Sequence, residues 1–87
     1  MDEPIVAKLR SGQADEAFAL LVPAYRRRVF ALAYAVLRDR AAAEDVAQET
    51  FVKLWRALPG FDGRAQLSTW IYAITRNVAI SALRRRR

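Results

Sequence analysis

The sequence FDGRAQLSTWIYAITRNVAISALRRRR, residues 61–87, decides how this chain folds. It contains no acidic residue after Asp62 and no glycine or proline after Gly63. From Leu67 onward, apolar residues recur at helical spacing on two sides of one predicted helix. A helix that is apolar on two sides packs inside a domain or is shared between a core and a partner. The stretch therefore predicts a helical bundle whose last helix starts near Leu67.

The two sides of this last helix differ in chemistry. We expect one side to face the core, with Leu67, Trp70, Ile71, Ile74, Val78 and Ala82. The other side is a mixed surface of Thr69, Tyr72, Ala73, Arg76, Ile80 and Leu83, with Asn77 at its edge beside Trp70. Such a surface is typical of a nucleic-acid contact. The terminal arginines fit phosphate binding, or equally the basic start of a linker.

The segment before this helix, Pro59–Gln66, is the only substantial predicted loop. Its aromatic residue Phe61 is flanked by Gly60 and Gly63, which free the backbone for an unusual path. Phe61 either plugs the protein's own core or binds a ligand. The loop and the start of the last helix bring together aromatic rings, hydrogen-bond donors and positive charge. This combination suits the binding of an unpaired nucleic-acid strand. The residues concerned are Phe61, Arg64, Trp70, Tyr72, Arg76 and Asn77.

Composition limits the fold and the function. The 87 residues fit one domain, and 54% hydrophobic residues with three glycines and three prolines favour an all-α fold of about four helices. Thirteen of the 15 basic residues are arginine, and the net charge is +6. The excess fits nucleic-acid binding, or merely surface charge and coding bias. Without cysteine or histidine, disulfides, thiolate nucleophiles, ordinary zinc sites and imidazole catalysis are excluded.

The remaining composition points to a cytoplasmic binding protein. Asp45 and Glu49 lack a metal-binding or base partner, so neither an enzyme nor a metal or cofactor site is expected. The longest apolar run, residues 29–37, is too short to cross a bilayer, and the acidic start lacks the order of a secretory signal.

Two further helices are predicted in the first half of the chain. Residues 5–10 form a short helix that ends at Ser11-Gly12 and packs as a lid. A longer helix runs from Ala14 to about Arg38, with an apolar stripe of Phe18, Val22, Tyr25, Val29, Leu32 and Val36. Pro23 predicts either a kink or two helices that meet there. The triplet Arg26–Arg28 is interpreted as solvated surface.

The third predicted helix, capped by Asp39, spans residues 41–58. Its core side comprises Ala43, Ala47, Thr50, Phe51, Leu54 and Leu58. The opposite side comprises Asp45, Gln48, Glu49, Val52 and Arg56, so that apolar Val52 lies in the middle of a polar face. This face is either a protein-docking site or an ordinary solvated face with one stray valine.

The sequence from AEDVAQETF through LWRALPGFDG to TWIYAITRN closely resembles conserved region 2 of bacterial sigma factors of the extracytoplasmic-function (ECF) group. The preceding AFALLVPAYRRRVFALAYAVL also resembles that family. The resemblance implies a compact helical bundle that binds core RNA polymerase and recognises the promoter minus ten element. It assigns the α-helical face of Asp45, Gln48, Glu49, Val52 and Arg56 to docking on the clamp helices of the polymerase β′ subunit.

The same resemblance implies the DNA-binding residues. Phe61, Asp62, Gly63 and Arg64 correspond to the specificity loop, and Asn77 with Ala57 to positions around a pocket for a base flipped from the non-template strand. Thr69, Trp70, Tyr72, Ala73 and Arg76 correspond to the helix that follows this strand, and Arg84 adds phosphate attraction. An anti-sigma factor that covers these surfaces is a further implied partner.

Two departures from the family pattern concern the first third of the chain. Gln13 stands where relatives often carry an acidic cap, and Pro23 interrupts a helix that is commonly continuous. We expect residues 1–83 to form the domain and 84–87 to begin a linker. The family's second DNA-binding domain is absent from the sequence, so we expect a truncated protein rather than one that acts with a partner. The alternatives are a stand-alone basic helical module that binds RNA or duplex DNA, and an amphipathic protein of the membrane surface.

Overall fold

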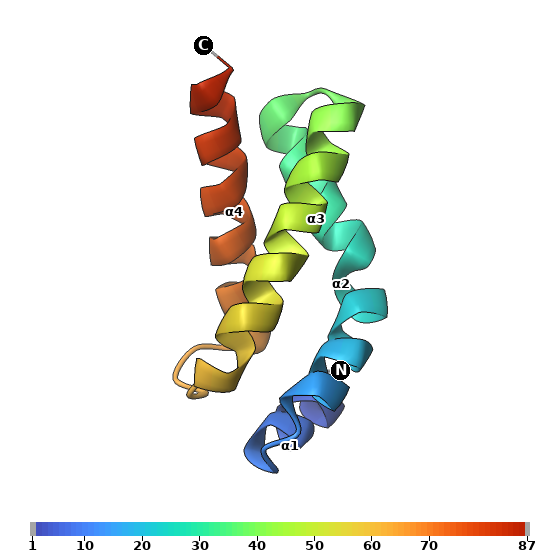
Figure 1. Cartoon of the computed structure of the whole chain (residues 1–87), viewed down its shortest axis with the longest axis vertical. Coiled ribbons are helices and arrows are strands. Elements are labelled where there is room, and N and C mark those ends of the chain that lie inside the picture. The colour runs from blue at the N-terminus through green and yellow to red at the C-terminus, as the bar shows by residue number, and fades with distance from the viewer. Residues whose placement is uncertain (1, 87) are drawn as a thin grey trace.

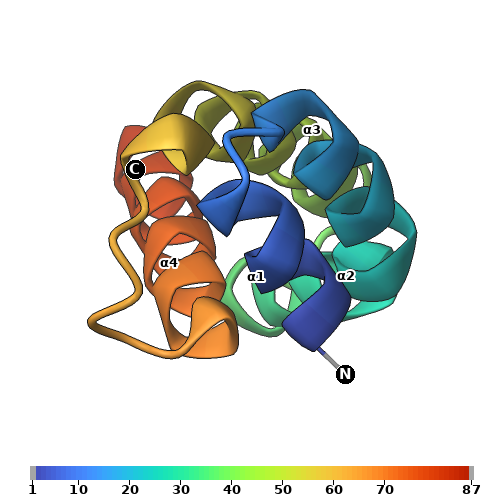
Figure 2. The ribbon, with the colours of Figure 1, turned by 90° about the horizontal axis from the view of Figure 1, so that it is seen from below.

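In the computed structural model, which describes residues 2–86, the chain forms an all-α bundle, as predicted (Figure 1). Its elements are α1 (Glu3–Arg10), α2 (Ala14–Leu37), α3 (Arg40–Ala57), the short 3-10 helix η1 (Leu58–Gly60) and α4 (Leu67–Arg85). Helices α2, α3 and α4 pack against one another in an elongated body of 43 × 20 × 18 Å. Helix α1 packs on α2 and covers one end of the bundle, which confirms the predicted lid (Figure 2).

The core consists of two clusters of buried side chains. The first lies towards α1 and contains Ile5, Ala17, Leu21, Tyr25, Val29, Leu54, Leu58, Leu67 and Ile71. The second lies towards the turn between α2 and α3 and contains Ala33, Leu37, Ala43, Val46, Val78 and Ala79. Three alanines, one from each long helix, allow the helices to approach closely in the second cluster. Among residues 2–86, no helix is long and apolar enough to cross a membrane.

Helix α2 differs from its prediction in two respects. It runs unbroken past Pro23, so the alternative of two helices meeting there is wrong. The predicted stripe is also only partly correct, because Tyr25 and Val29 are fully buried whereas Phe18, Val22, Leu32 and Val36 are half-buried. The core contacts are completed by Ala17, Leu21, Ala33 and Leu37. The buried side of α2 therefore combines small and large residues.

Helix α3 begins with the predicted cap. The Asp39 carboxylate accepts a hydrogen bond from the Ala42 N–H at 2.9 Å. Arg86, at the C-cap position of α4, donates to the Leu37 carbonyl at 3.1 Å and lies 3.8 Å from the Asp39 carboxylate. The end of α4 is thus fastened to the turn between α2 and α3. Arg84 and Arg85, assigned from sequence to a linker, are helical, and Arg87 lies outside the described residues.

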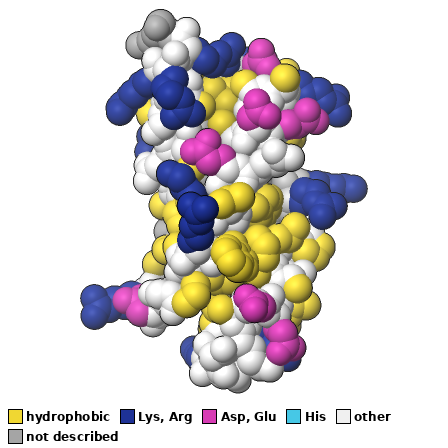
Figure 3. Space-filling model, in the orientation of Figure 1, with side chains coloured by type: hydrophobic (Ala, Val, Ile, Leu, Met, Phe, Trp, Pro, Cys, Tyr) yellow, Lys and Arg dark blue, Asp and Glu magenta, His cyan; other side chains and the backbone are white. Residues whose placement is uncertain are grey.

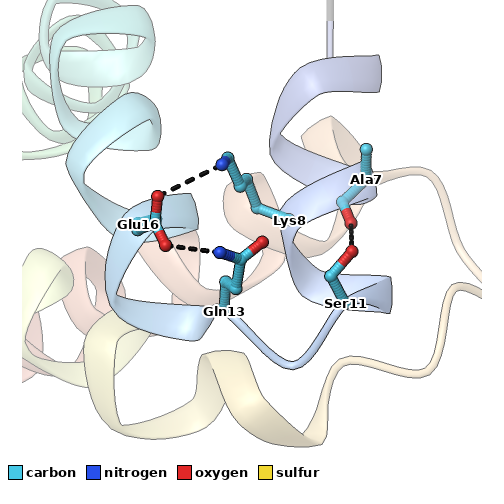
Figure 4. A network of polar contacts seen from close by, with 5 residues as sticks. All are labelled: Ala7, Lys8, Ser11, Gln13 and Glu16. Carbon is cyan, nitrogen blue, oxygen red and sulfur yellow. Dashed lines mark hydrogen bonds and ion pairs between the residues drawn. The ribbon is translucent and has the colours of Figure 1, made fainter.

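A polar network joins α1 to α2 (Figure 4). The Glu16 carboxylate accepts hydrogen bonds from Lys8 Nζ at 3.1 Å and from the Gln13 amide at 2.6 Å. Gln13 occupies the N-cap position of α2 without a side-chain capping bond to the backbone. Gly12, with φ of 74°, makes the turn that reverses the chain between the two helices.

Candidate nucleic-acid interface and protein-docking face

The loop before α4 is ordered by short-range contacts. The Phe61 N–H donates to the Leu58 carbonyl at 3.0 Å, which continues the turn of η1. The Asp62 carboxylate then accepts from the Arg64 N–H at 3.0 Å and lies 3.3 Å from the Arg64 guanidinium. Gly63 between them has φ of 80°, a value that favours glycine. The loop therefore presents Arg64 to solvent with its charge partly offset by Asp62.

Phe61 and Trp70 form an aromatic pair at the base of this loop. Their ring centroids are 5.0 Å apart and the ring planes are inclined by 53°. Both side chains are half-buried and pack on the first core cluster. Phe61 therefore packs on the protein's own core, as one interpretation predicts, and its partial exposure is compatible with the other.

The outward side of α4 carries four predicted residues, Thr69, Ala73, Arg76 and Asn77, all exposed. Tyr72 was placed with them but packs edge-on against buried Tyr25 of α2, with centroids 6.2 Å apart. Ile80 and Leu83, which shared that predicted side, are half-buried. At 100° per residue, Trp70 and Tyr72 lie about 160° apart around the helix. They therefore border the outward side of α4 on opposite flanks.

The predicted core side of α4 packs on the core, as expected, but it is incomplete. Leu67, Ile71 and Val78 are buried, whereas Trp70, Ile74 and Ala82 are half-buried. Thr75 and Ala79, which were not predicted, are fully buried. The Thr75 hydroxyl donates to the Ile71 carbonyl at 2.8 Å, so it enters the core without an unpaired polar group.

Ala57 and Arg84 lie at different distances from the aromatic pair. Ala57 is the exposed last residue of α3, directly before η1 and the loop. Arg84 is also exposed, but it lies eight residues beyond Arg76, or about 12 Å along the helix axis. Figure 1 shows that the loop and the end of α4 are at opposite ends of the helix. The structure thus brings Ala57 near the loop and keeps Arg84 away from it.

The predicted polar face of α3 is exposed throughout, at Asp45, Gln48, Glu49, Val52 and Arg56. Val52 is 48% exposed and Trp55, which sequence reasoning missed, is 52% exposed. At 100° per residue, Trp55 lies about 20° from Gln48, on the flank of the same face. An angular plot that included every large apolar residue would have placed Trp55 outside the core side.

A groove of about 770 Å³ between α2 and α3 adjoins this face. Its apolar lining comes from Val22, Phe30, Ala47 and Phe51, and its polar lining from Arg26, Arg27, Arg40, Glu44, Asp45 and Gln48. Figure 3 shows hydrophobic side chains gathered over α2 and α3 with charged side chains around them. The groove extends the α3 face towards α2, which sequence reasoning did not predict.

Residues 21–87 match the family described as Sigma-70 region 2. The chain is 33% identical over 82 residues to the ECF RNA polymerase sigma factor SigW of Bacillus subtilis, across 94% of this chain and 43% of that protein. It is 38% identical over 78 residues to the RNA polymerase sigma-H factor of Pseudomonas aeruginosa, across 90% of this chain and 40% of that protein. The chain therefore spans less than half the length of these two relatives.

A solved structure gives a similar result. The NMR structure of an engineered region 2 of sigmaE in complex with GTAAAA superposes with a TM-score of 0.80 at 36% sequence identity. The match covers 95% of this chain and 85% of that chain. The likeness includes α1 and the first turns of α2, which lie before the family match.

Proposed function

Because this chain belongs to the sigma-70 region 2 family and has ECF sigma factors among its relatives, we propose that it docks on core RNA polymerase and captures the unpaired minus ten strand of promoters. Sigma factors are transcription regulators, and polymerase acts in the bacterial cytoplasm, where we expect this chain to work. The proposal concerns two surfaces on different helices, one for DNA and one for polymerase.

The observation that carries the DNA half of the proposal is the Phe61–Trp70 pair beside the exposed residues of α4. A partly exposed pair of aromatic side chains offers a stacking surface for an unpaired base. The engineered region 2 of sigmaE, whose structure was solved in complex with GTAAAA, supports a nucleic-acid-binding role.

We assign the roles by position. Phe61 and the turn from Asp62 through Gly63 to Arg64 select a base, and Ala57 with Asn77 lines the pocket that receives it. Thr69, Trp70, Tyr72, Ala73 and Arg76 follow the strand along α4, and Arg84 attracts phosphates farther along. Extruding a base costs a few kcal/mol and stacking returns about 1 to 3 kcal/mol, so the domain traps an opened strand rather than forcing it open.

The test is the binding of a fluorescent single-stranded GTAAAA hexamer and of its single-base variants. We expect wild type to prefer one base at one position, and Phe61→Ala and Asn77→Ala to remove this preference. Ala31→Ser, on an exposed part of α2, is the matched control and is expected to keep it. Equal binding of every sequence by wild type would instead favour a generic basic module.

The polymerase half of the proposal rests on the exposed face of α3. Val52 and Trp55 provide an apolar centre, and Asp45, Gln48, Glu49 and Arg56 provide polar contacts around it. Interfaces commonly combine an apolar centre with a polar rim. We assign this face to the clamp helices of the β′ subunit. An anti-sigma factor that covers it would keep the chain from polymerase.

A charge placed at the centre of this face tests the assignment. Val52→Glu is expected to lower affinity for bacterial core RNA polymerase at least tenfold, because an unpaired carboxylate would be buried in the interface. Ala31→Glu adds the same charge to exposed α2 and is expected to have little effect. Similar losses from both variants would refute the α3 face as the docking site.

A further inference from the structure

Arg28 of α2 is held in place although its side chain is exposed. Its guanidinium carbon lies 4.1 Å from the centroid of the buried Tyr25 ring. One terminal nitrogen donates to the Tyr72 hydroxyl at 3.3 Å, and the other donates to the Ala24 carbonyl at 3.1 Å. The triplet Arg26–Arg28 is exposed, as the interpretation of solvated surface predicted, but Arg28 in addition links α2 to α4.

These contacts leave binding capacity on the guanidinium. Arginine has five N–H donors, and only two of those of Arg28 are engaged by Tyr72 and Ala24. The other donors belong to an exposed residue. A phosphate group can accept two parallel hydrogen bonds from such a fork. Because stacking on Tyr25 already restricts the side chain, binding would cost less conformational entropy than it does for a free surface arginine.

The position of Arg28 relative to α4 indicates which ligand would meet it. Tyr72 borders the outward side of α4 on the flank next to α2, and Trp70 borders it on the opposite flank. Arg76 follows Tyr72 by one helical turn and is exposed. A strand with one base against Phe61 and Trp70 that crosses α4 would reach Tyr72 and then Arg28. No residue of α2 was assigned to nucleic-acid binding from the sequence.

We propose that Arg28 binds a backbone phosphate of the nucleic-acid strand, in a site built by Tyr25, Tyr72 and Ala24. The inference rests on the proposed function, because it takes the strand to cross α4. It adds a second helix to the DNA-binding surface. The contact would read no base, since phosphate oxygens are the same at every position, but it would fix the direction in which the strand leaves the aromatic pair.

The experiment compares two variants that remove one positive charge from the same triplet. Arg28→Gln removes the proposed phosphate ligand, and Arg27→Gln removes a neighbouring arginine that lines the groove towards α3. The affinity for the single-stranded GTAAAA hexamer is measured from low to moderate salt, at a temperature where circular dichroism shows both variants folded. For Arg28→Gln we expect about fivefold weaker binding at low salt and a salt slope smaller by about 0.7. For Arg27→Gln we expect the wild-type slope.

An unchanged slope for Arg28→Gln, or equal reductions for both variants, would overturn the proposal. If Arg28→Gln does not fold, Arg28→Lys replaces it, since lysine keeps the charge but not the planar fork. It is expected to bind about threefold more weakly with the wild-type slope, and unchanged affinity would overturn the proposal. A failure of the proposed function would look different, because wild type would then bind GTAAAA and a shuffled hexamer equally.

Discussion

The hydroxyl group of Tyr25 donates to the carboxylate of Asp2, with both carboxylate oxygens 2.8 Å away. The Tyr25 side chain is fully buried in the first core cluster, and Asp2 immediately precedes α1. Burial, followed by the hydrogen bond and the negative charge of Asp2, raises the pKa of Tyr25 to about 12. One hydrogen bond therefore ties the start of the chain to the middle of α2.

This contact predicts a loss of stability in alkaline solution. The pKa of a tyrosine side chain is ordinarily 10.0, and that of Tyr25 in the folded protein is about 12. At a pH between these two values, the unfolded chain therefore binds fewer protons than the folded protein. This contribution to stability is complete below pH 10 and is lost as the pH rises towards 12, with a maximum loss of about 3 kcal/mol. Urea unfolding at pH 9 and pH 11.5 measures this loss, which Tyr25→Phe is expected to lack. Parallel losses in both proteins would contradict the assignment.

The backbone conformation of the loop predicts opposite effects on stability when Gly63 and Gly60 are replaced by alanine. A Cβ at Gly63 or at Gly60 would meet no atom within 4 Å, but Gly63 has φ of 80° and Gly60 does not have positive φ. Gly63→Ala is therefore expected to cost about 1 kcal/mol through backbone strain alone. Gly60→Ala is expected to be neutral or to stabilise by up to about 1 kcal/mol. Thermal unfolding measures both, and equal effects would show that φ does not determine the cost.

The cap formed by Asp39 predicts that alanine and asparagine at this position lower the stability by different amounts. Asp39→Ala removes the bond to the Ala42 N–H and the ion pair with Arg86, and is expected to cost about 1 kcal/mol. Asp39→Asn keeps a capping oxygen and removes only the charge, so a smaller loss is expected, since exposed ion pairs contribute little. Chemical denaturation at neutral pH measures the difference. If the two substitutions destabilise equally, the charge rather than the cap is the important part.

Trp55 predicts a separation of binding from stability. Because the side chain is 52% exposed, Trp55→Ala is expected to change the free energy of unfolding by less than about 1 kcal/mol. The same substitution is expected to weaken binding to core RNA polymerase about tenfold or more, since exposed tryptophans often dominate interfaces. Titration with polymerase and urea unfolding of the same sample test both parts. A large loss of stability would indicate a structural role instead.

The sequence predicted the elements well because their boundaries carry strong local signals. Asp39, Pro59-Gly60 and Ser11-Gly12 each mark an end that the structure confirms to within two residues. The exposed face of α3 was also predicted correctly, because charged and amide residues recur there at helical spacing. Local signals of this kind depend on neighbouring residues alone, so a single sequence is sufficient to read them.

The predictions of burial failed where small residues, or residues with both polar and apolar parts, pack in the core or between helices. Ala17, Ala33 and Ala79 are core residues, yet alanine has too little hydrophobic surface to mark a face. Thr75 enters the core because its hydroxyl bonds within its own helix, which polarity alone does not indicate. The contacts of Arg28 with Tyr72 join residues 44 positions apart, and helical periodicity contains no information about such pairs.

Helix α3 continues directly into η1, and Phe61 follows with no intervening flexible segment. The face around Val52 and the Phe61 side of the aromatic pair consequently lie on one continuous segment, which runs from α3 through η1. A single residue inserted near Arg56 would turn the loop by about 100° and advance it by about 1.5 Å relative to Val52. Changes in chain length at this place would therefore be less tolerable than changes in residue type, because they would alter the angle between the proposed polymerase-docking face and the proposed DNA-binding loop.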